Sequence, residues 1–430
     1  PMDSSDSIVR DPSKCIMCRR CENVCNQIQT VGALSAVNRG FDAVVATAFN
    51  EPIRNTVCVG CGQCVQACPV GALTVKSDLD RVIEALNDPE KVVVVNTAPA
   101  VRVALGEEFG YEPGSIVTGQ MVAALRKIGF NYVFDTDFAA DMTIMEEAHE
   151  LVGRLTAFLK GEKADLPLLT SCCPAWVSFI ETQFPDMLNL PSSAKSPMEM
   201  FGATTKTYFA EKIGVDAKNI FSVAIMPCTA KKAEARREEM GHDGVSDIDV
   251  SLTTTELAAL IKQANLDLWE LDDEEYDDPM GESTGAAVIF GKTGGVMEAA
   301  LRTAYEWVTG KSLDNVEFED IRTTQYGIKV AHVPVGDVTL NVAVASGLGN
   351  ARAIMEEIRN GNPNQLHAVE IMACPGGCVN GGGQPHHFGD MSIVSDRQRA
   401  LYEADQDKSI RKSHENPSIQ KIYQEYLGEP

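Results

Sequence analysis

The sequence contains no apolar run that is long and uninterrupted enough to form a transmembrane helix. Its most apolar stretch, residues 92–105, is broken by Asn96, Pro99 and Arg102, whereas a membrane span needs about 20 predominantly apolar residues. The opening residues PMDSSDSIVR also lack the apolar region of a secretory signal peptide. We therefore expect a chain that neither crosses a membrane nor carries a secretion signal.

Positive charge is scarce as well. The chain has 37 Lys and Arg against 61 Asp and Glu, which gives a formal net charge of −24. This imbalance argues against nucleic acid and against an anionic membrane surface as binding partners. A chain of 430 residues can bury a sizeable core, and we expect it to form two or three domains.

Cysteine, by contrast, is abundant. Thirteen cysteines in a chain of this size, without a signal peptide, indicate metal binding or thiol chemistry in a reducing compartment rather than secreted disulfides. We therefore expect a cytoplasmic protein.

Eight of the cysteines belong to an internal repeat, because residues 14–34 and 57–73 each contain the pattern C-x2-C-x2-C-x3-C. This spacing is typical of two 4Fe-4S clusters, in which the fourth cysteine of each run binds the other cluster. Zinc is the alternative, but zinc sites usually use two separated cysteine pairs. The predicted ligand sets are Cys15, Cys18, Cys21 with Cys68, and Cys58, Cys61, Cys64 with Cys25. Residues 1–85 are therefore expected to form a small α+β ferredoxin domain that carries single electrons, with a helix over residues 77–88 leading out of it.

The rest of the chain alternates short apolar runs with helix-like stretches. Runs of strand length occur at residues 91–96, 131–136, 221–227 and 367–374, and helices are expected over 143–161 and 294–310. This alternation predicts an α/β domain over residues 86–430, with largely parallel sheets flanked by helices. Ligand sites in such domains lie beyond the carboxyl ends of the strands.

The five remaining cysteines lie just after three short apolar runs, LPLL (166–169), FSVAIM (221–226) and VEIMA (369–373). They are Cys172, Cys173, Cys228, Cys374 and Cys378. Four could hold another iron-sulfur cluster, which leaves one over. Adjacent side chains point away from each other, so one of the pair in TSCCPAW (170–176) is expected to be a ligand. A leftover buried thiol is usually inert packing.

The segments TSCCPAW, MPCTAKKAE and EIMACPGGCVNGGGQ together resemble the three signature segments of the iron-only (FeFe) hydrogenases, in the same order. The resemblance covers essentially the whole chain. It implies reversible conversion of protons and electrons into H2 at an H-cluster, which lies between two lobes of the catalytic domain. The H-cluster consists of a 4Fe-4S cluster and a two-iron subcluster with CO, cyanide and a bridging azadithiolate.

The resemblance also implies residue roles. Cys173, Cys228, Cys374 and Cys378 would hold the H-cluster, with Cys378 also bridging to the two-iron subcluster. Cys172 would be the last group of the proton path. A thiol suits this because its reference pKa of roughly 8.5 lies near ambient pH.

From Cys172 the implied proton path runs to Glu150, Ser192, Glu147 and Arg154. The spacing of Glu147, Glu150 and Arg154 puts all three on one face of the expected helix. An ordinary solvated charge stripe explains this spacing equally well, and the residues alone favour that alternative.

A set of further residues matches the surroundings of the H-cluster in this family. Lys231 would donate a hydrogen bond to an iron-bound cyanide. The packing residues would be Ala98, Pro99, Met226, Phe290 and Met372, for which simple core packing is the alternative. The chain departs from common family forms at Ala175 and Ala100. These departures concern how the site is tuned and not which reaction it catalyses.

The implied partners are ferredoxin or a similar one-electron carrier and the hydrogenase maturation enzymes, with H2 and protons as substrates. Arg19 and Arg20 could help to dock an acidic ferredoxin, although ordinary surface charge is the favoured reading. Alternatives for the whole chain are a hydrogen sensor, a subunit of an electron-bifurcating complex, or a non-catalytic iron-sulfur assembly protein. Residues 266–282 are expected to be a solvated acidic insertion and residues 411–430 a helical segment, and the seven histidines are expected to be structural or solvated.

Overall fold

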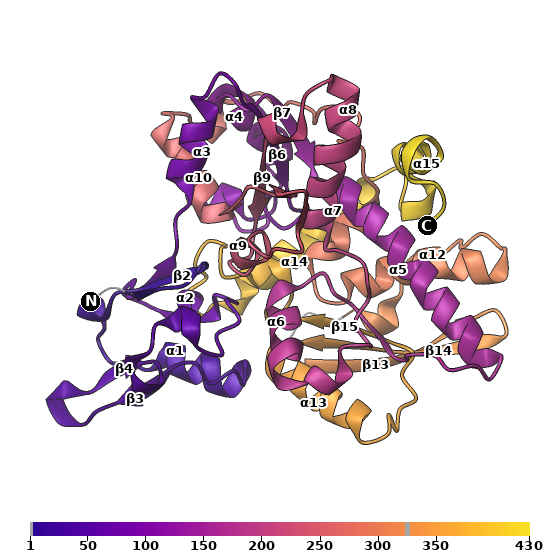
Figure 1. Ribbon diagram of the computed structural model, residues 1–430, viewed down its shortest axis with the longest axis horizontal. Coiled ribbons are helices and arrows are strands. Elements are labelled where there is room, and N and C mark those ends of the chain that lie inside the picture. The colour runs from indigo at the N-terminus through magenta and orange to yellow at the C-terminus, as the bar shows by residue number, and fades with distance from the viewer. Residues whose placement is uncertain (1–2, 323–326) are drawn as a thin grey trace.

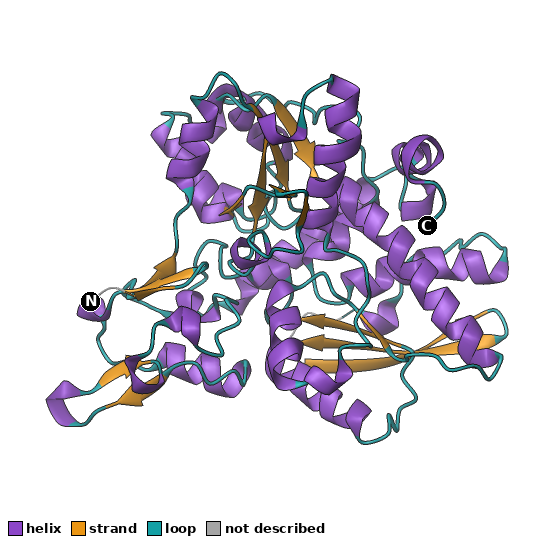
Figure 2. Cartoon of the chain, in the orientation of Figure 1, coloured by secondary structure: helices purple, strands orange, loops and turns teal. Residues whose placement is uncertain are grey.

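The computed structural model of the chain describes residues 3–322 and 327–430. Figure 1 shows a small N-terminal part beside two larger lobes, one above the other. Each lobe is built on its own four-stranded sheet with helices packed on it (Figure 2). This arrangement confirms the predicted two-lobed α/β fold preceded by a small α+β domain.

The N-terminal part contains two small antiparallel sheets, one of order β1-β2-β5 and one formed by β3 and β4. A short helix in each half of the repeat begins directly after a residue in the left-handed region, Arg19 (φ 62°) or Gly62 (φ 71°). This bend curves each run of three cysteines around one point. The elements are β1 (Asp3–Ser4), β2 (Ile8–Arg10), α1 (Arg20–Asn23) with a π-helical extension (Val24–Ile28), β3 (Ser35–Val37), β4 (Val44–Ala46), α2 (Gln63–Ala67) and β5 (Leu73–Val75).

The helix predicted over residues 77–88 is present as α3 (Leu79–Leu86). Its buried residues Val82 and Ala85 pack in the core of the upper lobe and not in the N-terminal part. The expected domain boundary at residue 85 therefore falls inside a helix whose contacts belong to the upper lobe.

The upper lobe contains a fully parallel sheet of order β12-β9-β6-β7. Helices α3, α4 and α10 pack on one face, and α5, α7 and α8 pack on the other. Three of its strands confirm predicted apolar runs. The elements are β6 (Val92–Thr97), α4 (Thr118–Ile128), β7 (Tyr132–Asp135), α7 (Pro197–Thr204), α8 (Ala210–Ile213), β9 (Ile220–Met226), β12 (Val250–Thr253) and α10 (Thr254–Gln263).

The lower lobe contains a sheet of order β13-β14-β15-β8, in which only the β13–β14 pair is antiparallel. Helices α6 and α13 pack on one face, and α12 with the second half of α5 packs on the other. The elements are β8 (Leu168–Leu169), α6 (Pro174–Gln183), α12 (Gly295–Thr309), β13 (Gly327–Val335), β14 (Val338–Ser346), α13 (Leu348–Arg359) and β15 (Ala368–Met372).

Helix α5 (Thr136–Leu159) joins the two lobes and is longer than the sequence predicted. It begins at Thr136 rather than near residue 143 because the Asp135 carboxylate, at the end of β7, accepts a hydrogen bond from the Asp137 N–H and caps it. Its first half packs in the upper lobe and its second half, at Leu151 and Leu155, in the lower lobe. One rigid element therefore passes alongside the space between the lobes.

The acidic segment 266–282 is not a solvated insertion, and this expectation was wrong. Leu268, Leu271 and Met280 are buried, and the Tyr276 hydroxyl lies 2.7 Å from the Thr97 hydroxyl. Asp277 accepts a hydrogen bond from the backbone N–H of β7 at Val133 (2.7 Å). The segment packs along the edge of the upper sheet, and its acidic residues cover its outer side.

The remaining elements close the space between the lobes or lie at the periphery. The C-terminal segment is helical, as predicted, and packs against α5. Within the described ranges, no helix is both long and apolar enough to span a bilayer. The elements are α9 (Lys231–Glu234), β10 (Gly241–His242), β11 (Val245–Ser246), α11 (Gly285–Val288), α14 (Met391–Asp407) and α15 (Pro417–Ile422).

Candidate active site

Two cavities in the N-terminal part divide the eight cysteines of the repeat into two groups of four. One cavity is lined by Cys15, Cys18, Cys21 and Cys68, and the other by Cys25, Cys58, Cys61 and Cys64. The fourth cysteine of each run therefore lies with the first three of the other run, as the repeat predicted. None of these eight cysteines forms a disulfide. Burial raises the pKa of Cys21 and of Cys58 to about 11, so these thiols become good ligands only when a cation is bound.

A third cavity lies between the lobes, and its volume of about 80 Å³ is several times what one water molecule needs. Cys172, Cys173, Cys228, Cys374 and Cys378 all line it. So do all five of the predicted packing residues, together with Lys231. The structure thus brings together residues that are spread over 280 positions of the chain, from Ala98 to Cys378.

The cavity lies at the carboxyl ends of four strands. Ala98 and Pro99 follow β6, and Cys228 follows β9 in the upper sheet. In the lower sheet Cys172 follows β8 and Cys374 follows β15. The upper and lower sheets present these ends to the same space, which explains why the signature segments follow strands.

The adjacent cysteines of TSCCPAW have different surroundings. Cys173 is the N-cap residue of α6, with an extended backbone (φ −96°), and it packs with the lower-lobe core and Cys228. Cys172 instead packs with Phe290 and Met372. Burial raises the pKa of Cys172 well above its ordinary value, and the Glu147 carboxylate raises it further. Cys172 therefore keeps its proton as a neutral thiol.

The other four thiols of the cavity fit an iron-sulfur cluster. Burial raises the pKa of Cys228 to about 12 and that of Cys374 well above its ordinary value, so four thiolates at this place require a bound cation. Two glycines of the lining pack closely against other backbone, because a Cβ on Gly377 would lie 2.5 Å from the backbone N of Thr293. A Cβ on Gly381 would clash with the Pro227 carbonyl oxygen. The segment around Cys378 can thus fold against its neighbours where side chains would not fit.

Lys231 is the first residue of α9 and is buried at the edge of the cavity. Its Nζ donates hydrogen bonds to the Glu234 carboxylate (2.6 Å) and to the Cys172 carbonyl oxygen (3.2 Å). Burial lowers the pKa of Lys231, but the Glu234 carboxylate outweighs this effect and raises it. Lys231 is therefore a fixed positive donor beside Cys172.

Three of the predicted proton-path residues, Ser192, Glu150 and Arg154, are joined by hydrogen bonds. The Ser192 hydroxyl donates to the Glu150 carboxylate (2.8 Å), and Arg154 donates to its other oxygen (2.6 Å). Arg154 is also held by the carbonyl oxygens of Asp165 and Leu190.

Glu147 lies deeper than the others. It is 3% exposed, and one of its carboxylate oxygens has no hydrogen-bond partner. Burial raises the pKa of Glu147 to about 8, and the neighbouring carboxylates add to this effect. The reading as a solvated charge stripe is therefore wrong, because Glu147 faces the protein interior.

The order of the two glutamates also differs from the expected one. Glu147 is the carboxyl that acts electrostatically on Cys172, whereas Glu150 pairs with Arg154 on the outer side, where the two side chains are 19% and 17% exposed. Glu147 and Ser192 are thus more deeply buried than Glu150 and Arg154. Residues spaced three apart on a helix share a face, so sequence spacing could not give their depth.

Several lining residues were missed by the sequence analysis. Thr136, Pro197 and Met198 also line the cavity. Thr136 follows β7, so its position after a predicted strand was a usable signal. Pro197 and Met198 begin α7 behind the N-cap Ser196, and no feature of their sequence indicates a nearby cavity. Glu234, the partner of Lys231, could have been found from its spacing of three residues.

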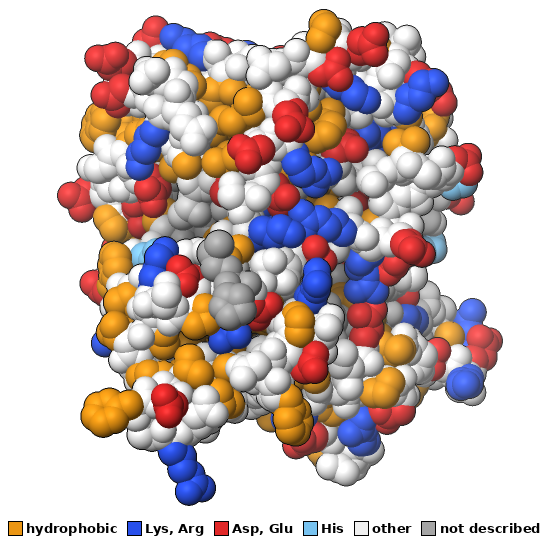
Figure 3. Space-filling view, turned by 60° about the vertical axis from the view of Figure 1, so that its left-hand side comes forward, with side chains coloured by type: hydrophobic (Ala, Val, Ile, Leu, Met, Phe, Trp, Pro, Cys, Tyr) orange, Lys and Arg blue, Asp and Glu red, His pale blue; other side chains and the backbone are white. Residues whose placement is uncertain are grey.

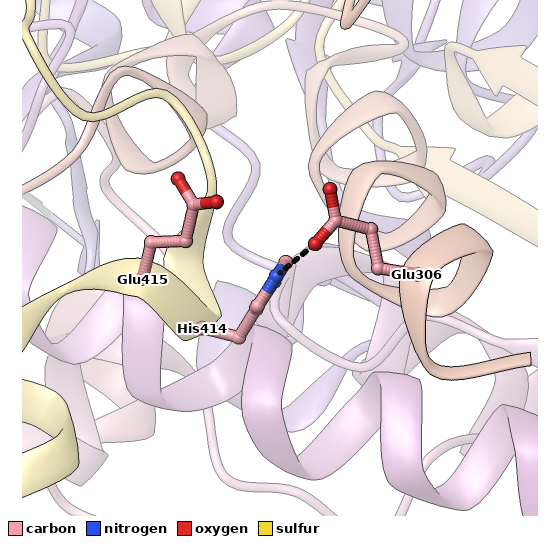
Figure 4. Close-up of side chains that lie close together, drawn as sticks. All are labelled: Glu306, His414 and Glu415. Atoms are coloured by element: carbon pink, nitrogen blue, oxygen red, sulfur yellow. Dashed lines mark hydrogen bonds and ion pairs between the residues drawn. The ribbon is translucent and has the colours of Figure 1, made fainter. Parts of the chain in front are cut away.

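A second group of possible metal ligands lies far from this cavity, at Glu306, His414 and Glu415 (Figure 4). His414 is fully used, because Nε2 lies 2.9 Å from Glu306 and Nδ1 lies 3.0 Å from the Thr303 hydroxyl. The Lys412 ammonium bonds to both glutamates. Partial burial opposes ionisation, but the bond from Lys412 helps to lower the pKa of Glu306 to about 2. The Lys412 ammonium thus helps to hold the C-terminal segment against α12. This agrees with a structural role for His414.

Comparison with known families gives three matches along the chain. The family described as iron only hydrogenase large subunit, C-terminal domain, matches residues 91–382. The iron hydrogenase small subunit family matches residues 391–430, and the 4Fe-4S dicluster domain matches residues 14–72.

Individual proteins show the same similarity. The NADP-reducing hydrogenase subunit HndD of Solidesulfovibrio fructosivorans is 56% identical over 100% of this chain and 73% of its own length. Iron hydrogenase 1 of Clostridium pasteurianum is 45% identical over 100% of this chain and 74% of its own length. Among solved structures, the FeFe-hydrogenase HydA1 of Chlamydomonas reinhardtii, in its apo form, superposes with a TM-score of 0.72 at 42% identity, covering 83% of this chain and 96% of that one.

Proposed function

Because the chain belongs to the family of iron-only hydrogenases, we propose that it converts protons and electrons into H2 and back at the cavity between its lobes. It is an oxidoreductase that uses two 4Fe-4S clusters and an H-cluster. The observation that carries the proposal is the convergence of four ligand-type cysteines, one additional thiol and one buried lysine on a single apolar cavity.

In this proposal Cys173, Cys228, Cys374 and Cys378 hold the H-cluster. When bound, that group supplies an iron centre with CO, cyanide and a bridging azadithiolate, at which H2 is made or split. Lys231 is positioned to donate a hydrogen bond into the cavity while Glu234 keeps it charged. The apolar side chains of Met226, Phe290 and Met372, with Ala98 and Pro99, exclude water and shape the site.

Protons pass through the protein by way of Cys172. Because burial keeps Cys172 protonated, its sulfur holds a proton at the cavity wall and can exchange it with the reacting centre. Glu147 has a pKa of about 8, so near neutral pH it can both accept and release a proton. Ser192 and Glu150 continue the relay, and Arg154 holds Glu150 in place near the surface.

Electrons are proposed to enter through the N-terminal part, from ferredoxin or a similar acidic one-electron carrier. Residues 14–72 contain five Lys and Arg against three Asp and Glu, in a chain with a net charge of −24. Ile16, Phe41 and Phe49 are also strongly exposed there, at 61%, 110% and 96%. The face that carries this part shows apolar side chains along its lower edge (Figure 3). A local basic and apolar surface suits an acidic partner.

A single comparison tests the proposed reaction. The chain is loaded by the hydrogenase maturation enzymes under anaerobic conditions, and H2 evolution from reduced methyl viologen is measured beside the infrared bands of CO and cyanide. We expect H2 from the wild type, and a large loss in Cys172→Ala with the bands retained. Fully loaded wild type that makes no H2 would refute the proposal and favour an assembly or electron-carrier role.

A second candidate is favoured by the 56% identity to a subunit of an NADP-reducing hydrogenase. In that case the same site splits H2 within a larger complex, and the electrons leave for a nicotinamide-reducing partner. Isolation of the native complex decides this: co-purifying subunits with H2-dependent NADP reduction support it, and a lone chain that reduces only ferredoxin contradicts it. The cytoplasm remains the proposed location, on the ground of the thirteen cysteines, and cell fractionation tests it.

A further inference from the structure

Two loops that carry different sets of cysteines touch each other through glycine. Gly62 lies between Cys61 and Cys64 of the N-terminal part, and Gly382 lies after Cys378 in the C-terminal signature segment. A Cβ built on Gly382 would be 2.5 Å from the Gly62 Cα and 2.9 Å from the Cys61 carbonyl oxygen. Neither contact is possible for a real side chain, so the two backbones meet at a distance that only glycine allows.

Buried glutamines hold this contact from the N-terminal part. The Gln63 amide donates to the Asn380 carbonyl oxygen (2.8 Å), and the Gln66 amide donates to the Gln384 carbonyl oxygen (2.7 Å). Gln29 donates to the Ala373 carbonyl oxygen (2.8 Å), and its own amide oxygen accepts from the backbone N–H of Leu348 (2.9 Å). Gln66 also donates to the Gly381 carbonyl oxygen (3.3 Å). All these bonds to the signature segment end on its backbone, on either side of its cysteines.

The upper lobe adds a fourth tie. The Thr229 hydroxyl, next to Cys228, donates to the Gly60 carbonyl oxygen (2.6 Å). A Cβ on Gly62, next to Cys61, would clash with the Thr229 hydroxyl, next to Cys228. The second cysteine set of the N-terminal part therefore adjoins the central cavity directly.

The bonds from the three glutamines and from Thr229 are uncharged, whereas Arg352, which bonds to Thr30 of the N-terminal part, carries a charge. Among the described residues, those that line the cavity of Cys25, Cys58, Cys61 and Cys64 include no charged side chain. A hydrogen bond from a neutral side chain fixes the distance between the two cysteine sets without adding a charge between them. A charge at that place would shift the energy of an electron on either side.

From this geometry we infer that Gly382, Gln63 and Gln66 are positioning residues that set the separation between the second ferredoxin cluster and the H-cluster. The inference rests on the proposed function. The step concerned moves one electron at a time: with H2 as reductant, the H-cluster side is oxidised and the ferredoxin side is reduced, without a bond made or broken between them.

Two variants test this on the fully loaded enzyme. Gly382→Ala adds one methyl group against the Gly62 backbone, and the double variant Gln63→Met, Gln66→Met removes both hydrogen bonds at nearly constant side-chain size. Gln27→Met is the matched control, because Gln27 lies on the same part of the chain but is exposed. After rapid mixing with H2, the reduction of the ferredoxin clusters is followed by visible absorbance and by electron paramagnetic resonance, and the H-cluster by its infrared bands.

We expect the wild type and Gln27→Met to show the same fast reduction of the ferredoxin clusters. Both junction variants should lose the fast phase while their cluster content and infrared bands stay unchanged. In the double variant, hydrogen exchange should also rise in the backbone amides of residues 374–384, which is a readout independent of turnover.

The outcomes separate the two proposals. If wild type reacts rapidly and the double variant with intact clusters reacts equally fast, with unchanged hydrogen exchange, the inference is wrong. If Gly382→Ala does not take up its clusters, the double variant decides. If the wild type itself is not reduced by H2, the proposed function has failed, and hydrogen exchange alone then reports whether the glutamines hold the junction.

Discussion

Replacing Glu147 by glutamine is expected to make the protein more stable and less active at the same time. The carboxyl group is 3% exposed, and burial raises its pKa from 4.5 to about 8. Glutamine keeps the size of the side chain and can never ionise. The substitution therefore removes an electrostatic cost from the fold and a proton carrier from the relay.

The direction in which pH changes the stability follows from proton binding in the folded and unfolded states. Above pH 4.5 the unfolded chain loses this proton, whereas the folded protein keeps it until about pH 8, so rising pH favours unfolding. Below pH 4.5 Glu147 costs the folded protein no stability. The cost grows as the pH rises and is complete above about pH 8. At about 1.4 kcal/mol per pKa unit, the cost avoided by Glu147→Gln is roughly 2 kcal/mol at pH 6 and roughly 4 kcal/mol at pH 8.

Anaerobic calorimetry of the loaded protein at pH 6 and pH 8 measures this difference. The melting temperature of Glu147→Gln should exceed that of wild type by more at pH 8 than at pH 6, while H2 evolution falls at least about tenfold, a loss of 1.4 kcal/mol in transition-state stabilisation. Glu162→Gln is the control, because Glu162 is exposed just beyond α5. An equal gain at both pH values would show that Glu147 is already ionised in the folded protein, and unchanged turnover would remove it from the relay.

Three further predictions test other parts of the account. Ser192→Ala removes the hydroxyl that donates to Glu150 (2.8 Å), so turnover should fall about tenfold with unchanged infrared bands; equal turnover would show that the relay bypasses Ser192. Lys232→Met leaves the buried Glu256 carboxylate without its Lys232 partner, while Asp78 keeps its ion pair with Arg236, and denaturant unfolding should show a loss of about 3 kcal/mol; a stability near that of wild type would contradict it. Arg20→Glu should raise the KM for an acidic ferredoxin several-fold at low salt and less at high salt, with methyl viologen kinetics unchanged; a KM independent of the substitution would remove this surface from docking.

Much of the architecture followed from patterns that depend only on local chemistry. The repeat gave both groups of four cysteines in the N-terminal part, because the spacing of the thiols decides which of them can face one point. The apolar runs gave three strands of the upper sheet and β15, and the three signature segments follow strand ends as parallel sheets require. Cys172 and Cys173 have different surroundings, as expected from the divergence of neighbouring side chains.

What was missed depends on packing between distant segments. The depths of Glu147 and Glu150 are decided by which turn of α5 faces the lower lobe, and their spacing is the same in either case. The acidic segment 266–282 was misread because its many charges hid the apolar contacts of Leu268, Leu271 and Met280. The glutamines that hold the N-terminal part bind backbone carbonyls more than 300 positions away, and such partners leave no trace in local sequence.

Isotope exchange tests the central claim most directly. The loaded enzyme is placed under D2 in ordinary water, and mass spectrometry follows the appearance of HD and H2, with infrared spectra confirming an intact H-cluster. The account predicts rapid exchange by the wild type and almost none by Cys172→Ala with its CO and cyanide bands retained. Exchange at the wild-type rate in Cys172→Ala, or its absence from the fully loaded wild type, would contradict the claim that hydrogen is made and split in this cavity with protons delivered by Cys172.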